Sequence, residues 1–169
     1  MRALKIVPGH GESPLLATRH LVDAFQRAAD RQRGLSFFRS TLAVETVGFR
    51  PWQGCQMGVL ITPWFMNLII LPGLGMDWSA FPVGMQQRWH FPSGSYEFTG
   101  GHIGNLGPYQ SCALFSPVPD FADQAAAHAA ARSALDALFT PPDSEPGRLA
   151  RLLSRRGFLG GKWTGDRPP

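Results

Sequence analysis

The sequence predicts an α+β domain in which an antiparallel sheet of about five to six strands is flanked by a long N-terminal helix and a long C-terminal helix. Helical stripes of apolar residues lie toward the two ends of the chain. Between them, short apolar segments alternate with prolines and glycines. Such short connections favour antiparallel pairing of neighbouring strands. Helices placed before and after a run of strands are typical of the α+β class.

The first helix is predicted from Ser13 to about Arg33. A hydroxyl side chain at Ser13 followed by Pro14 is a typical helix start, because proline fits the first helical position. The apolar stripe that would face the sheet consists of Leu21, Val22, Phe25, Ala28 and Ala29.

Six segments have the character of strands. They span residues 42–49, 55–62, 64–71, 86–91, 95–99 and 109–115, with a loop over 74–84 and a glycine-rich connection over 100–107. In the second segment, alternate residues from Cys55 to Ile61 share one face, which predicts a half-buried strand. The second helix is predicted from a cap at Asp120 to about Phe139 because its interior is rich in alanine.

These elements divide the chain into three regions. Residues 1–12 are predicted to be a flexible N-terminus, 13–140 a single α+β domain and 141–169 a basic tail with prolines and glycines, in which 147–156 is a short candidate helix. Of the net charge of +4, the tail contributes six basic and three acidic residues, whereas the chain through Phe139 has ten basic and nine acidic ones. A nucleic-acid partner is therefore not expected, because such proteins carry a basic stripe on the folded domain.

The residues that could carry chemistry are few. Cys55 and Cys112 are not part of a CxxC pair, and we interpret them as two buried thiols, with a disulfide between them as the alternative. The five histidines show no metal-ligand spacing. We expect no metal, no cofactor, no catalytic residue and no integral membrane segment. The N-terminus lacks the apolar stretch of a secretory signal, so no such signal is expected there.

Aromatic, proline and methionine residues gather at the predicted strand ends. They lie in the segments 44–52, 58–68, 91–98 and 109–117. Core packing and turns explain many of these side chains, and a recognition surface for another protein is the alternative. The predicted partner-binding residues are Arg50, Trp52, Pro63, Trp64, Phe65, Asn67, Phe91 and Tyr96.

These four segments together resemble the HybE/HupJ family of nickel–iron hydrogenase assembly chaperones. The most specific parts are Val47-Gly48-Phe49-Arg50 and Ile61-Thr62-Pro63-Trp64-Phe65-Met66-Asn67. The resemblance implies a cytoplasmic helper that binds hydrogenase precursors, namely the small subunit with its twin-arginine export signal and, as a second partner, the large subunit. It would delay export of the small subunit until maturation is complete. Some relatives carry a rubredoxin domain, for which this sequence lacks the cysteine pairs.

The tail contains Ser154-Arg155-Arg156-Gly157-Phe158-Leu159, which is similar to a twin-arginine export signal but has no apolar helix after it. We hypothesise that Arg155, Arg156, Phe158 and Leu159 imitate the cargo signal and are autoinhibitory. The cargo groove would then need acidic groups, for which Glu45, Asp77 and Glu97 are the candidates. Basic residues near a helix end are the plainer interpretation of this segment.

Two other functional classes compete with a binding protein. A metal or redox helper in iron–sulfur cluster assembly would use Cys55 or Cys112. A small-molecule enzyme would need a deep pocket with perturbed titratable groups.

Overall fold

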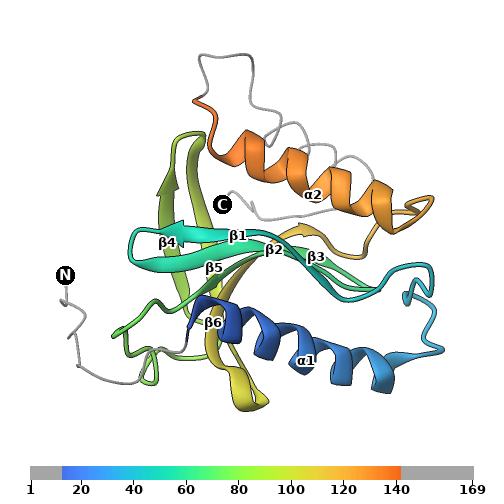
Figure 1. Ribbon diagram of the computed structural model, residues 1–169, viewed down its shortest axis with the longest axis horizontal. Coiled ribbons are helices and arrows are strands. Elements are labelled where there is room, and N and C mark those ends of the chain that lie inside the picture. The colour runs from blue at the N-terminus through green and yellow to red at the C-terminus, as the bar shows by residue number, and fades with distance from the viewer. Residues whose placement is uncertain (1–12, 142–169) are drawn as a thin grey trace, which may run out of the picture.

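The computed structural model describes residues 13–141 and confirms the predicted α+β fold (Figure 1). Two long helices lie on opposite sides of a six-stranded antiparallel sheet. The elements are α1 (Pro14–Gln32), β1 (Glu45–Trp52), β2 (Cys55–Ile61), β3 (Met66–Leu71), β4 (Gln86–Phe91), β5 (Gly94–Ile103), the 3₁₀ helix η1 (Gly104–Leu106), β6 (Gly107–Phe115) and α2 (Gln124–Leu138).

The strands are arranged in the order β1-β2-β3-β6-β5-β4, so β1 and β4 are the two edges of the sheet. Each neighbouring pair is antiparallel, and β4 and β5 form an uninterrupted hairpin from Gln86↔Thr99 to Phe91↔Gly94. The β4–β5 hairpin turns away from the rest of the sheet and reaches the C-terminal end of α2 (Figure 1). There the backbone N–H of Ser93 donates to the carbonyl oxygen of Leu138 at 3.2 Å.

The central strands are buried on both faces, so the prediction that β2 is half-buried was wrong. Met57, Val59 and Ile61 point into a core that includes the alanine face of α2, whereas Leu60 points into a second core against α1. The sheet lies between two helices, and both of its faces are therefore apolar at the centre. The stripe of α1 meets the second core through Leu21, Phe25 and Ala29.

The cap of α2 is Asp123, not the predicted Asp120. The carboxylate of Asp123 accepts a hydrogen bond from the backbone N–H of Ala126 at 2.8 Å, which satisfies one of the free donors at the start of the helix. Asp120 instead pairs with Arg39 at 2.9 Å. Both carboxylates precede the alanine run, and only the backbone path decides which of them caps the helix.

Several strand boundaries are shifted from the prediction. The first strand begins at Glu45 and continues through Pro51 to Trp52. The third begins at Met66 because Thr62 and Phe65 form a turn, in which the Thr62 hydroxyl accepts from the Phe65 N–H at 2.9 Å.

The glycine-rich connection is mostly strand rather than loop, because β5 extends to Ile103 and β6 begins at Gly107. At Gly101 a Cβ atom would lie 2.6 Å from the Tyr109 ring, so the absence of a side chain at this position leaves room for the ring to pack against the backbone of β5.

Residues 1–12 and 142–169 lie outside the described part of the chain. The candidate helix 147–156 and the twin-arginine-like segment fall in this range. The division into regions 1–12, 13–140 and 141–169 therefore stays a prediction.

Candidate functional site

The predicted partner-binding residues fall into two separate groups. The first group lies where the β1–β2 turn, the β4–β5 turn and the end of α2 meet. We call it the edge cluster; it consists of Arg50, Trp52, Phe91, Tyr96 and the neighbouring Phe139. Pro63, Trp64 and Phe65 form the turn before β3, and with Phe25 and Phe38 we call them the turn cluster. Sequence alone could not separate the two groups because the strand order is not visible in it.

The edge cluster joins the two opposite edges of the sheet through stacked aromatic rings. Trp52 stacks on Phe91 with ring centroids 5.4 Å apart and an interplanar angle of 11°, and Phe139 meets Trp52 edge-on at 4.9 Å. Trp52 is brought there by a tight turn in which Gln53 and Gly54 both have positive φ. Aromatic pairs of this kind contribute about 0.5–1.5 kcal/mol beyond the area that they bury.

Arg50 adds a charge to the edge cluster. Its guanidinium carbon lies 3.6 Å from the centre of the Phe139 ring, a close cation–π contact. The Tyr96 hydroxyl shares a hydrogen bond with the Ser93 hydroxyl at 2.9 Å. The cluster is therefore largely a structural junction, since Phe91 is buried and Trp52 half-buried. Phe139 was missed as a site residue because it follows the last turn of a helix, where an aromatic residue usually packs on the core.

The turn cluster packs against α1 and the segment that follows it. Trp64 stacks on Phe38 with ring centroids 6.3 Å apart, and Phe65 meets the Trp64 ring edge-on at 5.4 Å. Phe25 of α1 contacts Phe65 at 5.6 Å. Pro63 is buried, whereas Trp64 and Phe65 are half-buried. The rings therefore keep part of their surface open at this end of the molecule.

A pocket of about 320 Å³ adjoins the turn cluster at the end of α1; we call it the helix-end pocket. Its apolar wall includes Phe38, Leu42 and Pro63, and its polar groups come from Gln26, Arg33 and Ser40. Leu35 and Phe37, in the segment that lines the pocket on one side, are 47% and 42% exposed. Sequence analysis missed this pocket; exposed apolar residues after the helix-ending Gly34 were the available signal.

Asn67 lies on β3 and is half-buried. Its neighbours Met66 and Leu68 point into the core against α2, so the Asn67 side chain lies on the opposite face, toward α1. The side-chain oxygen is buried and has no hydrogen-bond partner among residues 13–141. Asn67 is thus a polar residue next to the turn cluster.

The two thiols are far apart. Cys112 pairs with Leu68 of β3, whereas Cys55 of β2 lies beside the far end of β3, so strand spacings place the two cysteines roughly 16 Å apart. A disulfide would need Cα atoms within about 7 Å. The two cysteines form no disulfide, but only Cys55 is buried as predicted, because Cys112 is half-buried.

Cys55 has a poorly reactive environment. Its sulfur lies 3.5 Å from the sulfur of Met76, and burial raises the pKa of its thiol to about 11. Because the thiolate is the form that attacks disulfides and binds metals, Cys55 is a weak candidate for redox or cluster chemistry.

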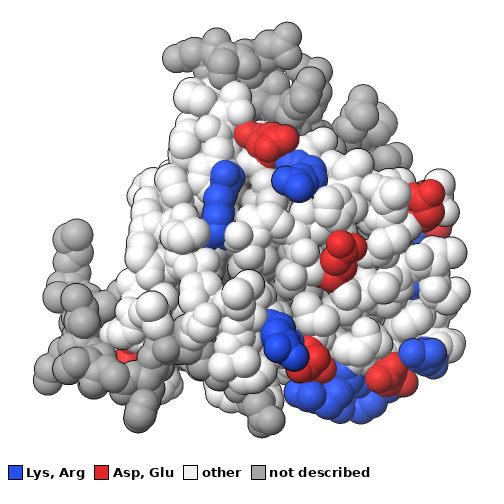
Figure 2. Space-filling view, viewed as in Figure 1, with Lys and Arg blue, Asp and Glu red and all other residues white. Residues whose placement is uncertain are grey.

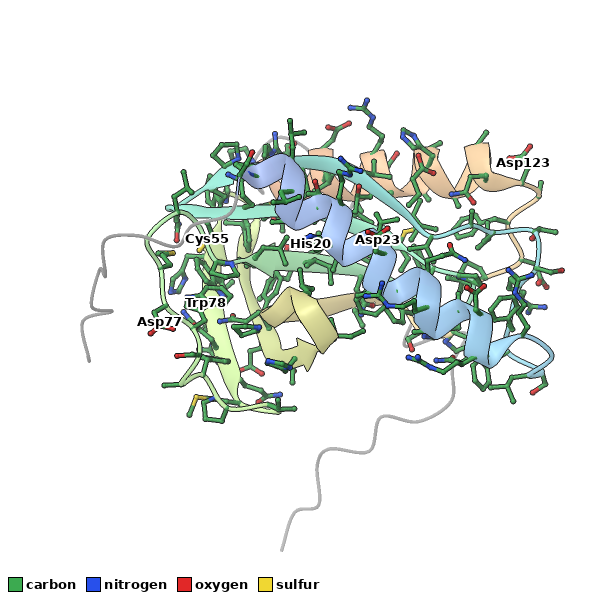
Figure 3. The ribbon with its side chains drawn as sticks, turned by 60° about the horizontal axis from the view of Figure 1, so that its bottom comes forward. His20, Asp23, Cys55, Asp77, Trp78 and Asp123 are labelled. Carbon is green, nitrogen blue, oxygen red and sulfur yellow. The ribbon has the colours of Figure 1, made fainter. Side chains whose placement is uncertain are left out.

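The three predicted groove acids do not come together. Glu45 accepts from the side chain of Gln124, next to Asp123 at the start of α2, whereas Figure 3 shows Asp77 at the opposite end of the molecule, beside Trp78 and Cys55. Glu97 pairs with Arg88 at 2.9 Å. Hydrogen bonds from the Ser79 side chain and N–H lower the pKa of Asp77, which stays ionised on the surface. These three candidates therefore do not form one acidic groove together.

Charged residues are sparse and of mixed sign on the face shown in Figure 2, where they gather mainly toward the end at which α1 finishes. Within residues 13–141 there is no group of three or more His, Cys, Asp or Glu residues that could hold a metal ion. No helix in the same range is long and apolar enough to span a membrane.

The chain is thus a small α+β domain with two helices, half-exposed aromatic rings and an adjoining pocket. The chain belongs to the HybE family of NiFe-hydrogenase assembly chaperones, whose family model matches residues 17–161. The predicted family is thereby confirmed.

Two named proteins are similar to the chain over most of their length. The chain is 39% identical to the hydrogenase expression/formation protein HupJ of Bradyrhizobium diazoefficiens, over 85% of this chain and 87% of HupJ. It is 40% identical to protein HoxT of Cupriavidus necator, over 93% of this chain and 95% of HoxT.

The solution structure of HybE from Escherichia coli has the same fold. It aligns with a TM-score of 0.61 over 96% of this chain and 91% of HybE, at 23% sequence identity.

Proposed function

We propose that this chain binds precursor subunits of a nickel–iron hydrogenase and delays twin-arginine export of the small subunit until its maturation is complete. The observation that carries this proposal is the helix-end pocket, which is open and partly apolar and is lined by the chain segment that also carries the exposed Leu35 and Phe37. Exposed apolar groups beside a pocket favour an apolar side chain of a partner as the occupant. The binding site would lie in the cytoplasm, where precursors are made, and would need no cofactor.

The mechanism is equilibrium binding without a chemical step. An apolar side chain that fills a pocket contributes about 1.5–3 kcal/mol, so two or three such contacts offset much of the cost of association. A micromolar dissociation constant corresponds to about 8 kcal/mol. That affinity holds a precursor at cellular concentrations and still releases it when the partner subunit or the export machinery competes.

The turn cluster and the helix-end pocket are the proposed contact surface for the small-subunit precursor. Trp64, Phe65 and Asn67 supply aromatic and polar contacts beside the pocket, and Pro63 forms part of its wall. The edge cluster, which includes Arg50, Trp52, Phe91 and Tyr96, mainly stabilises the fold. Arg50 lies on the surface and is proposed as a further contact for the precursor. The large subunit is a second candidate partner of the same surface.

The tail segment adds a proposal about control of binding. In this proposal, the tail occupies the proposed contact surface of its own chain until a precursor displaces it. The residues that would make this contact are Arg155, Arg156, Phe158 and Leu159. Deleting residues 147–169 should then tighten the binding of a small-subunit signal peptide. Unchanged or weaker affinity would contradict this control.

Co-purification from cells that make the hydrogenase tests the proposed function. The tagged chain should recover the small-subunit precursor with its export signal uncleaved. A Leu35→Ser/Phe37→Ser variant should lose most of the precursor, whereas the matched Leu74→Ser control, which changes an exposed apolar side chain elsewhere, should retain it. Recovery of mature subunit alone, or equal recovery by all three proteins, would contradict the proposal.

A further inference from the structure

The two edges of the sheet differ in how they are protected from further pairing. Edge strand β1 has a bulge between Val47 and Arg50 and contains Pro51, which has no N–H to donate. The Gln124 side chain at the start of α2 bonds the backbone of Ala43, just before the strand. Bulges, prolines and coverage by a helix are the usual means by which proteins block an edge.

The other edge strand, β4, is less protected, although the side chain of Gln53 in the β1–β2 turn donates to the His90 carbonyl near its end. Its pairing with β5 runs without a bulge from Gln86 to Phe91, and it contains no proline. Figure 1 shows β4 at the outer margin of the sheet.

The direction of the backbone groups of β4 can be assigned from two hydrogen bonds. The N–H of Gly100 in β5 donates to the carbonyl of Met85 at 2.8 Å, so Met85 and every second residue after it face β5. The residues between, Gln86, Arg88 and His90, direct their N–H and C=O groups outward. In agreement, the His90 carbonyl accepts from the side chain of Gln53 at 3.4 Å.

We propose that the outer edge of β4 pairs with an extended segment of the precursor that this chaperone binds, adding a seventh strand to the sheet. The proposal rests on the proposed function and assigns a second contact to it, distinct from the helix-end pocket. Apart from the His90 carbonyl, no outward backbone group of β4 has a hydrogen-bond partner among the described residues. Backbone pairing of this kind is tolerant of sequence, which suits precursors that are not yet folded.

The side chains around the edge indicate the chemistry of that segment. One face of the β4–β5 hairpin is polar, with Arg88 paired to Glu97 and His90 to Ser95, whereas Trp89 and Phe91 on the other face are apolar. A strand with alternating apolar and polar residues would continue both faces. The exposed side chains of Val83 and Met85, 71% and 50% accessible, extend the apolar contact just before β4.

The charge on β4 disfavours a second copy of this chain as the occupant. Arg88 is the one residue on β4 with a permanent charge. Antiparallel pairing of two β4 strands about a two-fold axis centred on Arg88 would place the two arginines opposite each other, which is unfavourable. A segment with an acidic residue at that position would pair favourably.

The test uses the full chain and a synthetic peptide of about eight alternating valine and threonine residues with a central glutamate, sized to the strand. Calorimetry should show binding. Methylating the alternate peptide nitrogens that would face β4 should weaken it by about tenfold or more, because those hydrogen bonds are lost. On the protein, Arg88→Pro removes one outward N–H and should weaken binding similarly, whereas Arg88→Ala, which keeps the N–H, should change affinity by less than about threefold.

Hydrogen exchange supplies a readout that does not depend on the variants folding. In the wild-type chain, the amides of Gln86, Arg88 and His90 should exchange fast and become protected when the peptide binds. No binding, binding that is indifferent to methylation, or protection by self-association at rising protein concentration would overturn the proposal. If the precursor still co-purifies through the helix-end pocket in any of these cases, the proposed function stands and only the edge contact fails.

Discussion

The indole ring of Trp52 stacks on the phenyl ring of Phe91, with centroids 5.4 Å apart, although the two residues lie on strands at opposite edges of the sheet. Phe139 closes the contact at the end of α2. The sheet therefore curves until the end of β1 reaches the tip of the β4–β5 hairpin beside this helix. The relationship links three parts of the chain that are far apart in sequence, so it should contribute to the cooperativity of folding.

Replacing Trp52 by alanine should lower the free energy of unfolding by about 2–4 kcal/mol, because a half-buried indole and its two ring contacts are lost. Chemical denaturation measures this loss. A double-mutant cycle with Trp52→Leu and Phe91→Leu should give a coupling of about 0.5–1.5 kcal/mol. Additive effects of the two substitutions would show that the rings do not interact.

The two carboxylates before α2 should differ in their effect on stability. Asp123→Ala removes a helix cap and should cost about 1 kcal/mol. Asp120→Ala removes only an exposed ion pair with Arg39 and should cost less than about 0.5 kcal/mol. Thermal unfolding of the two variants distinguishes them, and a larger loss for Asp120→Ala would mean that the sequence-based assignment of the cap was correct after all.

Cys55 should be chemically inert in the folded chain. Burial raises the pKa of the thiol from 9.0 to about 11, so very little thiolate is present at neutral pH. Alkylation of Cys55, followed by mass spectrometry, should be slow until the chain unfolds. Rapid alkylation at neutral pH would restore the redox interpretation.

The same pKa shift predicts how stability changes at alkaline pH. The folded chain favours the protonated thiol, so this contribution is fully present below pH 9 and is lost as the pH rises through about 11. The wild type should therefore lose more stability across this range than a Cys55→Ala variant, as measured by urea unfolding. Parallel curves for the two proteins would contradict the shift.

Two glycines should respond very differently to a methyl group. A Cβ at Gly73 would lie 1.6 Å from the carbonyl oxygen of Gly54, so Gly73→Ala should cost more than about 3 kcal/mol or prevent folding. Gly34 has open space around it and a φ of +92°, so Gly34→Ala should cost only about 1–2 kcal/mol of backbone strain. Soluble yield and thermal unfolding measure both effects, and equal stability of the two variants would be inconsistent with the packing of Gly73.

The helices and the approximate strands could be predicted because their periodicity is local. The cap at Asp123 and the start of β3 at Met66 could not, because a single hydrogen bond decides each of them. The strand character of the glycine-rich segment also escaped prediction. Its glycines admit the Tyr109 ring, and this packing depends on β5 and β6 lying side by side.

The candidate site was predicted in composition but not in arrangement. Aromatic residues such as Trp52 and Trp64 were identified as a single surface, whereas the strand order places them in two clusters. The helix-end pocket forms between α1 and the segment that precedes β1, so no single stretch of sequence could indicate it.

Calorimetric titration of the purified full chain with the purified small-subunit precursor tests the central claim most directly. The account predicts micromolar binding to the wild type and at least about tenfold weaker binding to the Leu35→Ser/Phe37→Ser variant, with Leu74→Ser close to wild type. Equal affinity of all three proteins for the precursor, or no binding by the wild type, would contradict it.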